Sequence, residues 1–403
     1  MKDGSIGGNK IAERMMVLNF EFYTASRIVF GNNRFYDIKN IAPQYAHNYL
    51  IVSGGGSIHR SGKMKELEDQ LAQAGLSFYH YSGIVNEPTP EDVDKGVAIA
   101  KSKNCNGVIA IGGGSVIDTG KAISGLITNE GYIKDYLEGV GKGKRLVEDP
   151  APFIAIPTTA GTGSEVTKNA VITSTEEKYK KSFRDDRLIP DVALVDPVLT
   201  LSLSPFNTAT SGMDALTQLI ESYVSRKAQP IPEALAVYGI KLAARSLITA
   251  YYDGQNLAAR QDMALASLLS GICLANSGLG AAHGIAAALG CHYGIPHGLV
   301  CAILLPHIME YNMEAQLKKY AEIGRILTGK SIDDDRQAAL EGVEYIREIS
   351  RKMNIPADLK EFSIDEQDLP LLAESSRGNS MSGNPVEMSD QDIIDLLKKL
   401  IKD

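Results

Sequence analysis

The chain of 403 residues is too long for one typical domain, so we expect two. Its composition, 44% hydrophobic and 22% charged, is that of a globular protein, and a net charge of −8 argues against a nucleic-acid or anionic-membrane partner. Its four cysteines show no CxxC spacing, which favours reduced, buried thiols in a cytoplasmic protein over disulfides or a thiolate metal site.

The first half alternates between strand and helix signals. Residues 1–18 are polar, lack a signal-peptide apolar block and are expected to be a flexible leader. Strand signals follow at 19–31, 49–57, 78–84, 107–115, 153–165 and 192–197, and helical patterns lie between them at 63–75, 89–103 and from 115 onward. Because the strands are continuous apolar runs, we predict an α/β domain over 19–196 with a parallel sheet and helices on both faces.

The second half changes character after Pro197. Its long segments carry a 3.6-residue periodicity and almost no strand signal. We therefore predict an all-helical domain over 197–403, with helices at 207–225, 232–252, 258–278, 314–327, 337–353 and 390–402. No segment reaches the ~18 uninterrupted apolar residues of a membrane span.

Three predicted strands end in glycine-rich loops suited to phosphate, at 53–57, 111–121 and 157–165. The GxGxxG fingerprint fails, because Ile117 and His59 stand where glycine is needed, and the NTPase loop fails in its spacing. A single loop of this kind is more often a tight turn. Three at the carboxyl ends of successive strands, where α/β sheets bind ligands, favour a nucleotide site.

Four side chains of the helical half have spacings suited to one divalent metal. Asp214 and Gln218 lie four residues apart on one predicted helix face, and His283 and His297 lie fourteen apart in small-residue contexts. Such an ion would bind the oxygen of an alcohol or carbonyl and lower the pKa of a hydroxyl, so that hydride could pass to a nicotinamide. Taken singly, each residue could instead be a cap, a surface amide or a structural histidine.

As a set, the motifs resemble the iron-containing (group III) alcohol dehydrogenases over about residues 20–400. The resemblance rests on GMDALTQ, AAHG, IPHGLVCAILLP, GGGSVIDTGKA, IPTTAGTGSEVT and IPDVALVDP. It implies the dehydroquinate synthase-like fold of that family: a dinucleotide-binding α/β domain, a helical metal domain and catalysis in the cleft between them. It also implies that Asp214, His283 and His297 are metal ligands and serve in catalysis.

The chain departs from the family pattern at three positions. Gln218 stands where the family usually has a histidine ligand. An amide oxygen as fourth ligand and three ligands with water both stay open, and the expected divalent metal is Fe, Mn or Zn. Ala287 replaces a histidine that serves as a proton relay, and nearby His292 is either a substitute or a structural residue. Val386 replaces the arginine of an NPR segment, and we assign it no catalytic role.

The resemblance also assigns the cofactor loops. The 112–115 turn should face the pyrophosphate, with Asp118 near the nicotinamide side, Asn86 near the adenosine half, and Lys181 or its neighbour Lys180 near a ribose. The predicted cofactor-binding residues are Gly54, Gly55, Gly56, Ser57, Asn86, Gly113, Gly114, Ser115, Asp118, Thr158, Thr159, Thr162 and Lys181.

Cofactor choice should follow from charge. NAD-preferring members place an aspartate after the first strand, whereas this chain has an uncharged turn at 53–57 followed by His59 and Arg60, which favours NADP while leaving NAD possible. We expect an NADP-dependent alcohol dehydrogenase or aldehyde reductase that acts on a small alcohol or aldehyde as a homodimer or larger oligomer. The alternatives are a polyol dehydrogenase, an oxo-acid reductase, or a nucleotide-binding protein without catalysis.

Overall fold

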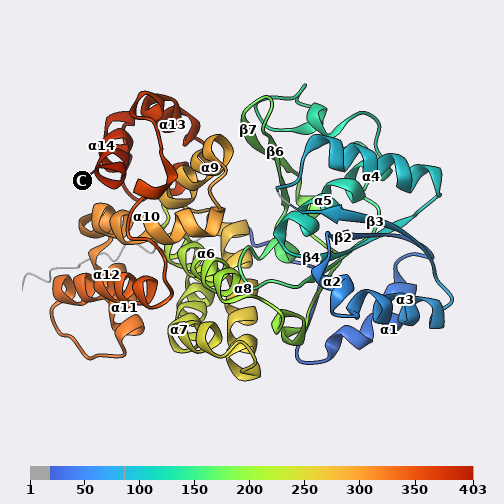
Figure 1. The fold of residues 1–403 in the computed structure, drawn as a ribbon, viewed down its shortest axis with the longest axis horizontal. Helices are drawn as coiled ribbons and strands as arrows, with labels where there is room; N and C mark the ends of the chain where they lie inside the picture. Colours follow the sequence, from blue (N-terminus) through green and yellow to red (C-terminus); the bar gives the residue numbers. More distant parts are fainter. Residues whose placement is uncertain (1–18, 86, 403) are drawn as a thin grey trace, which may run out of the picture.

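The computed structural model describes residues 19–85 and 87–402, which form a sheet-based half and a helical half (Figure 1). The predicted leader 1–18 and Asn86 lie outside the described residues. The change from strands to long helices falls between β8 (Val192–Val195) and α6 (Pro205–Val224), with a short 3₁₀ turn between them.

The first half is built on a six-stranded sheet with the order β1-β8-β5-β4-β2-β3, in which all neighbours run parallel. Its other strands are β1 (Arg27–Phe30), β2 (Asn48–Gly54), β3 (Ser77–Ile84), β4 (Gly107–Gly112) and β5 (Phe153–Pro157). The helices are α1 (Ile38–Ile41), α2 (Ser57–Arg60), α3 (Lys63–Gln73), α4 (Pro90–Ser102) and α5 (Gly114–Ile127). The order doubles back between β2 and β4, which makes the sheet doubly wound.

Helices cover both faces of this sheet, as the continuous apolar strands predict. Along β2, Leu50 and Val52 pack with α4 and α5, whereas Tyr49 and Ile51 pack with α1 and α3 on the other face. All four side chains are fully buried, which leaves no polar face along this strand. The predicted parallel α/β fold is therefore confirmed.

Two local features differ from the sequence prediction. A two-stranded antiparallel hairpin, β6 (Asn169–Ser174) and β7 (Tyr179–Arg184), was not predicted, because β7 is polar and half-exposed. In the 19–31 segment only β1 is a strand. The residues before it cross to the helical half, where Tyr23 exchanges hydrogen bonds with Asn276, so they cannot pair in the sheet.

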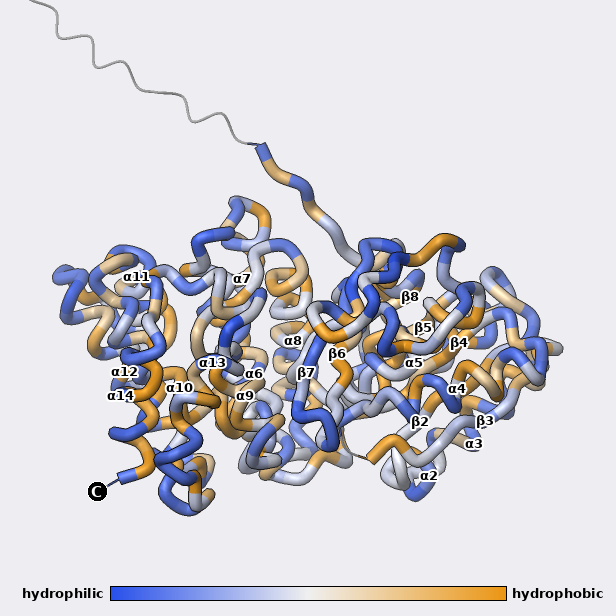
Figure 2. The backbone as a smooth tube through the Cα atoms, turned by 90° about the horizontal axis from the view of Figure 1, so that it is seen from above, coloured by the Kyte–Doolittle hydropathy of each residue, from blue (hydrophilic) through white to orange (hydrophobic). Residues whose placement is uncertain are grey.

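The helical half confirms the predicted all-α class. Beside α6 it contains α7 (Pro230–Tyr252), α8 (Leu257–Ser277), α9 (Ala281–Tyr293), α10 (His297–Asn312), α11 (Leu317–Thr328), α12 (Asp335–Lys352), α13 (Leu369–Ser375) and α14 (Asp390–Ile401). Helices α9 and α10 were not predicted from periodicity, because they are apolar or small around most of their circumference. Figure 2 shows hydrophobic stretches inside both halves, for example on β4, β6 and α10.

One described helix, α8, is long and apolar enough to cross a membrane by length and composition alone. It packs extensively against α6 and α7, and its most apolar window is two-thirds buried inside the protein. These contacts are those of a core helix.

Candidate functional site

A pocket of about 790 Å³ lies at the carboxyl ends of β2, β4 and β5. These three strands are neighbours in the sheet, so the three glycine-rich loops of the sequence meet at the point where the strand order doubles back. The predicted cofactor residues that line the pocket are Gly54, Gly55, Gly56, Ser57, Gly113, Ser115, Thr158 and Thr159.

Close backbone packing explains two of the glycines beside this pocket. A Cβ on Gly113 would lie 3.3 Å from Thr159 Cγ2, and one on Gly114 would lie 2.7 Å from Thr162 Cγ2. Any larger residue at 114 would therefore push Thr162 away from the start of α5. Thr162 itself contacts the loop without lining the pocket, and its hydroxyl accepts the N–H of Ser164.

Two predicted cofactor residues lie away from the pocket. Asp118 is buried on α5, where one carboxylate oxygen accepts the N–H of Val171 in the β6–β7 hairpin. Its burial raises its pKa, although the nearby Lys121 opposes this. Lys181 is on β7, paired with Ile172, and it is partly exposed.

A second site lies in the helical half, where ligand atoms of Asp214, His283, His297 and Cys301 all lie within 4.8 Å of one another. Asp214 is on α6, His283 on the first turn of α9, and His297 begins α10. Asp214 Oδ1 lies 3.2 Å from His283 Nε2 and 3.9 Å from His297 Nε2. The structure thus brings together the three ligands implied by the sequence.

Glu221 holds the His283 ring in place. Its carboxylate accepts a hydrogen bond from His283 Nδ1 at 2.6 Å and also accepts the N–H groups of Gly280 and Ala282 at the start of α9. Because Glu221 holds Nδ1, the Nε2 side of the ring, 3.2 Å from Asp214 Oδ1, is the side that a metal would take in place of the hydrogen bond to Asp214. The sequence contained this signal, since Glu221 lies seven residues after Asp214 and therefore on the same face of α6.

Glycines let these helices meet. A Cβ on Gly298 would lie 2.4 Å from the carbonyl oxygen of Thr210 on α6, and one on Gly284 would lie 2.9 Å from the carbonyl of Ser376. The glycine after each histidine, in AAHG and IPHG, is therefore required by close backbone contact.

The fourth member of the cluster, Cys301, was not predicted. Its Sγ lies 3.8 Å from His297 Nε2, one helical turn away on α10, and the residue is fully buried. Burial raises the pKa of the thiol, but the neighbouring rings of His283 and His297 outweigh it and hold the pKa below its ordinary value. The i, i+4 spacing in HGLVC was the signal that could have found it.

The histidines of this cluster stabilise the ionised form of Asp214. Burial alone would raise the pKa of Asp214, but the hydrogen bond to His283 and the charge of His297 leave it lowered. A carboxylate that stays ionised in a buried position is suited to a cation.

Gln218 lies beside the cluster, and its side-chain oxygen already accepts a hydrogen bond. Ser270 Oγ donates to Gln218 Oε1 at 2.8 Å, and the nearby Gln218 amide helps to lower the pKa of Asp214. Gln218 is fully enclosed by α6 and α8.

Two other segments considered in the sequence, around His292 and around Val386, are held by hydrogen bonds. His292 Nε2 lies 3.0 Å from Ser375 Oγ, so this ring is held against α13. The NPV segment caps α9: Asn384 Oδ1 accepts the N–H of Ala281 and an amide hydrogen of Asn312. This places the segment two residues from His283, where it helps to fix the start of the helix.

The two sites are joined by α6. Asn207 near its start lines the pocket at the strand ends, and Asp214 follows seven residues later, about 10 Å along the axis. A doubly wound sheet with a glycine-lined pocket is typical of an α/β protein that binds a nucleotide. One helix connects this pocket to the cluster of acid and imidazole side chains, which is a candidate metal centre.

Comparison with known proteins narrows this class to a family. Residues 25–197 match the model of iron-containing alcohol dehydrogenase, and residues 208–401 match the C-terminal model of the same family. Alcohol dehydrogenase 4 of Saccharomyces cerevisiae is 38% identical over 87% of this chain and 90% of its own. Lactaldehyde reductase of Escherichia coli is 36% identical over 86% and 90%.

Solved structures agree with the sequence relatives. A crystal structure of 1,3-propanediol oxidoreductase superposes with a TM-score of 0.90 at 33% identity, over 95% of this chain and all of the other. An alcohol dehydrogenase from Oenococcus oeni gives 0.89 at 32% identity over the same shares. The chain belongs to the iron-containing alcohol dehydrogenase family and is an oxidoreductase that acts on CH–OH groups.

Proposed function

We propose that this protein is an NADP-dependent, metal-dependent alcohol dehydrogenase, working as an aldehyde reductase in the reverse direction. The observation that carries the proposal is the cluster of Asp214, His283 and His297. Helix α6 connects this cluster to a pocket built by three glycine-rich loops. Primary alcohols and the corresponding aldehydes are the expected substrates, as the names of the relatives suggest.

The donor set fits a divalent ion such as Fe, Mn or Zn. Carboxylate and imidazole are suitable ligands, and the Glu221–His283 pair is the acid–histidine arrangement that commonly supports a metal-bound ring. When bound, the ion acts as a Lewis acid on the substrate oxygen and the nicotinamide takes up or delivers hydride. Asp214, His283 and His297 hold the ion, and Glu221 fixes the His283 ring.

The choice of NADP is supported by the charges around the pocket. Among the described residues, its charged lining residues are Arg60 and Lys63, both basic, and none is acidic. The Arg60 guanidinium lies over the glycine turn, where a Cβ on Gly56 would be 2.6 Å from Arg60 Nη1. A 2′-phosphate would find a cation and small donor-rich groups there, whereas an NAD-selective site offers a carboxylate to the ribose hydroxyls.

The remaining cofactor roles rest on the family resemblance and on position. Gly113 and Ser115 begin α5, so the pyrophosphate would lie at a helix N-terminus. Asp118 and Lys181 would act from the hairpin side, toward the nicotinamide half. No histidine stands at Ala287, and His292 is held by Ser375, so we propose that the proton leaves through water or the cofactor ribose.

A reductase of an oxo acid is the second candidate, because Lys178, Lys180 and Lys181 of the hairpin lie close enough to α9 to act electrostatically on Cys291. Lys180 is also near enough to influence His297. However, Lys180 pairs with Glu87 at 2.9 Å, which removes most of the attraction for a substrate carboxylate. A polyol dehydrogenase would use the same three ligands, and a protein that has lost catalysis would show no turnover with any metal.

The deciding experiment combines elemental analysis of protein purified without added metal with a comparison of NADP and NAD on a panel of alcohols, aldehydes, polyols and oxo acids. We expect a bound divalent metal, NADP preference and turnover of short primary alcohols. Absence of turnover with Fe, Mn, Zn, Co and Ni would overturn the proposal.

The Gly55→Asp variant tests the cofactor choice directly. A Cβ at this position would meet only the tip of the exposed Val85 side chain, so the loop can accept the change. The new carboxylate should lower NADP use and favour NAD, and an unchanged preference would contradict the assignment. We further propose a cytoplasmic location, consistent with the four free cysteines. A homodimer or larger oligomer is proposed from the family resemblance alone.

A further inference from the structure

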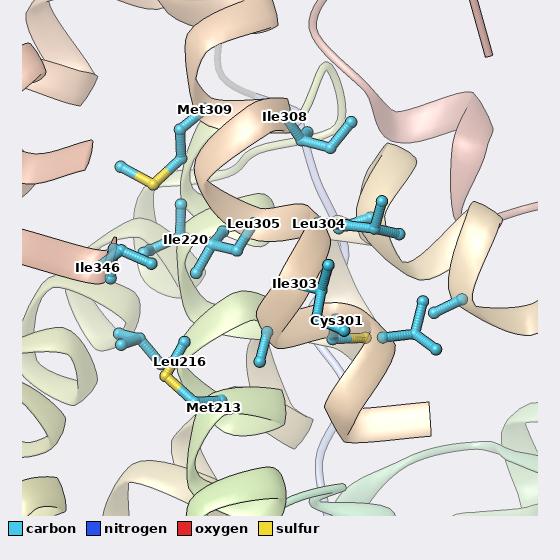
Figure 3. Packing of buried hydrophobic residues seen from close by; sticks show 14 of the residues in the cluster. Met213, Leu216, Ile220, Cys301, Ile303, Leu304, Leu305, Ile308, Met309 and Ile346 are labelled. Carbon is cyan, nitrogen blue, oxygen red and sulfur yellow. The ribbon is translucent and has the colours of Figure 1, made fainter. Parts of the chain in front are cut away.

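The cluster in the helical half contains one more potential ligand than the three implied by the resemblance. Cys301 projects from the first turns of α10 beside His297, and Figure 3 shows it at the end of the packed core formed by α6 and α10. It is fully buried, so its thiol faces the cluster and the core rather than solvent. Its partners in space are His283, His297 and Asp214.

The spacing of the donor atoms matches a four-coordinate site. With Zn–S near 2.3 Å and Zn–N near 2.05 Å, a tetrahedral ion separates sulfur from nitrogen by about 3.6 Å and oxygen from nitrogen by about 3.3 Å. The Cys301 Sγ to His297 Nε2 distance is 3.8 Å, and the Asp214 Oδ1 to His283 Nε2 distance is 3.2 Å. The Asp214 Oδ1 to His297 Nε2 distance is longer, at 3.9 Å, and the four ligand atoms all lie within 4.8 Å of one another. The sulfur therefore lies near the place of a fourth ligand.

Gln218 is already engaged elsewhere. Its Oε1 accepts the Ser270 hydroxyl, whose single hydrogen is shared with the carbonyl oxygen of Ser267 on the same helix. Its side chain also supports Asp214. To become a ligand, the amide oxygen would have to be shared between the metal and the Ser270 hydroxyl, whereas Cys301 Sγ already lies among the ligand atoms of the cluster.

We infer that Cys301, and not Gln218, completes the protein ligand set as an Asp–His–His–Cys site, with Gln218 orienting Asp214. This rests on the metal site of the proposed function and names its fourth ligand. A thiolate is a soft donor, so the site should prefer Zn²⁺ or Co²⁺ over the harder Mn²⁺, and binding should release the thiol proton. Substrate would then enter as a fifth ligand.

Spectroscopy of the wild-type protein tests this without any substitution. Loaded with Co²⁺, it should show a thiolate-to-cobalt charge-transfer band in the near ultraviolet, and X-ray absorption at the Zn edge should show one sulfur at about 2.3 Å. A metal-loaded protein with only nitrogen and oxygen neighbours would overturn the inference.

Three variants then locate the sulfur. Cys301→Ala should abolish the band and weaken Zn²⁺ binding by at least ~10–100-fold. Cys273→Ala, which removes an equally buried thiol of the same half, should keep both. Gln218→Ala should keep the band. Persistence of the band in Cys301→Ala, or its loss only in Gln218→Ala, would contradict the assignment.

The result is independent of turnover. A protein with the cobalt band and no dehydrogenase activity would defeat the proposed function and leave the ligand assignment standing. An active enzyme without the band would do the opposite. If Cys301→Ala fails to fold, the wild-type spectra still decide.

Discussion

The two sites of this protein are built in opposite ways. The pocket at the strand ends is shaped mainly by backbone, from glycine turns that follow buried strands, and much of it is open to solvent. The cluster in the helical half is made of side chains from three helices. Asp214, His283 and Cys301 are buried, and His297 is partly exposed. Glu221 holds the His283 ring. We therefore expect the pocket to be most sensitive to changes at its glycines, and the cluster to be most sensitive to loss of its ligand side chains.

The largest expected effect comes from removing a charged ligand. Asp214→Ala should leave the imidazoles without a counter-charge, so that metal content falls and turnover drops by ~10²–10³-fold. Elemental analysis and kcat measure the two effects together. Asp262→Asn is the matched control, because that aspartate pairs with Arg245 on the surface of the same half and should keep its metal. Full metal content in Asp214→Ala would contradict the side-chain description of the cluster.

Next in size is the support of His283. Glu221→Gln keeps the shape but weakens the hold on the ring and on the N–H groups of Gly280 and Ala282, so metal affinity should fall ~10–100-fold. Competition with a chelator measures this. Excess metal should restore turnover if Glu221 acts by positioning His283, whereas a misfolded helix start would leave the enzyme inactive at any metal concentration.

A smaller effect is expected in the backbone-built pocket. Gly114→Ala would place a methyl 2.7 Å from Thr162 and shift the first turn of α5, so KM for the cofactor should rise roughly tenfold, about 1.4 kcal/mol, with metal content unchanged. Gly378→Ala, a glycine with open space around it, is the control for adding a methyl. Loss of metal in Gly114→Ala would erase the distinction between the two sites.

The same contrast explains what could be predicted from the sequence. Each glycine loop is one continuous stretch of sequence that directly follows an apolar run. The sheet and the pocket residues from Gly54 to Thr159 could therefore be predicted together. Asp214, His283 and His297 were found because motifs mark them. The role of the motif residues remains a prediction that the variants above test.

What was missed depends on contacts between distant segments. Glu221 and Cys301 are a turn or two from recognised residues, but their roles depend on how α6, α9 and α10 cross, and no local pattern gives those crossings. The β6–β7 hairpin was missed because a polar strand such as β7 lacks an apolar run. Helices α9 and α10 carry no amphipathic period, because they are surrounded by protein.

The smallest expected effect concerns the seam between the two halves, where the Ser164–Val166 turn packs against α8. Glu165 in this turn is buried, and burial raises its pKa from 4.5 to about 7. Below pH 4.5 the carboxyl is neutral in both the folded and unfolded protein, so it does not lower the free energy of unfolding. Between pH 4.5 and 7 the unfolded chain loses the proton first, so unfolding is favoured and stability falls as pH rises.

Glu165→Gln removes this titration while keeping an amide of similar size. The shift corresponds to ~3 kcal/mol in the ideal case, and relaxation around a buried carboxyl reduces it to about 1 kcal/mol. Unfolding midpoints at pH 5 and pH 8 should therefore converge in the variant relative to wild type, with the variant gaining at pH 8. Asp118 has a pKa shifted in the same direction, so part of the slope will remain. An equal fall in stability in both proteins would mean that the ionised Glu165 carboxylate is in contact with water. The seam between the two halves would then be accessible to solvent.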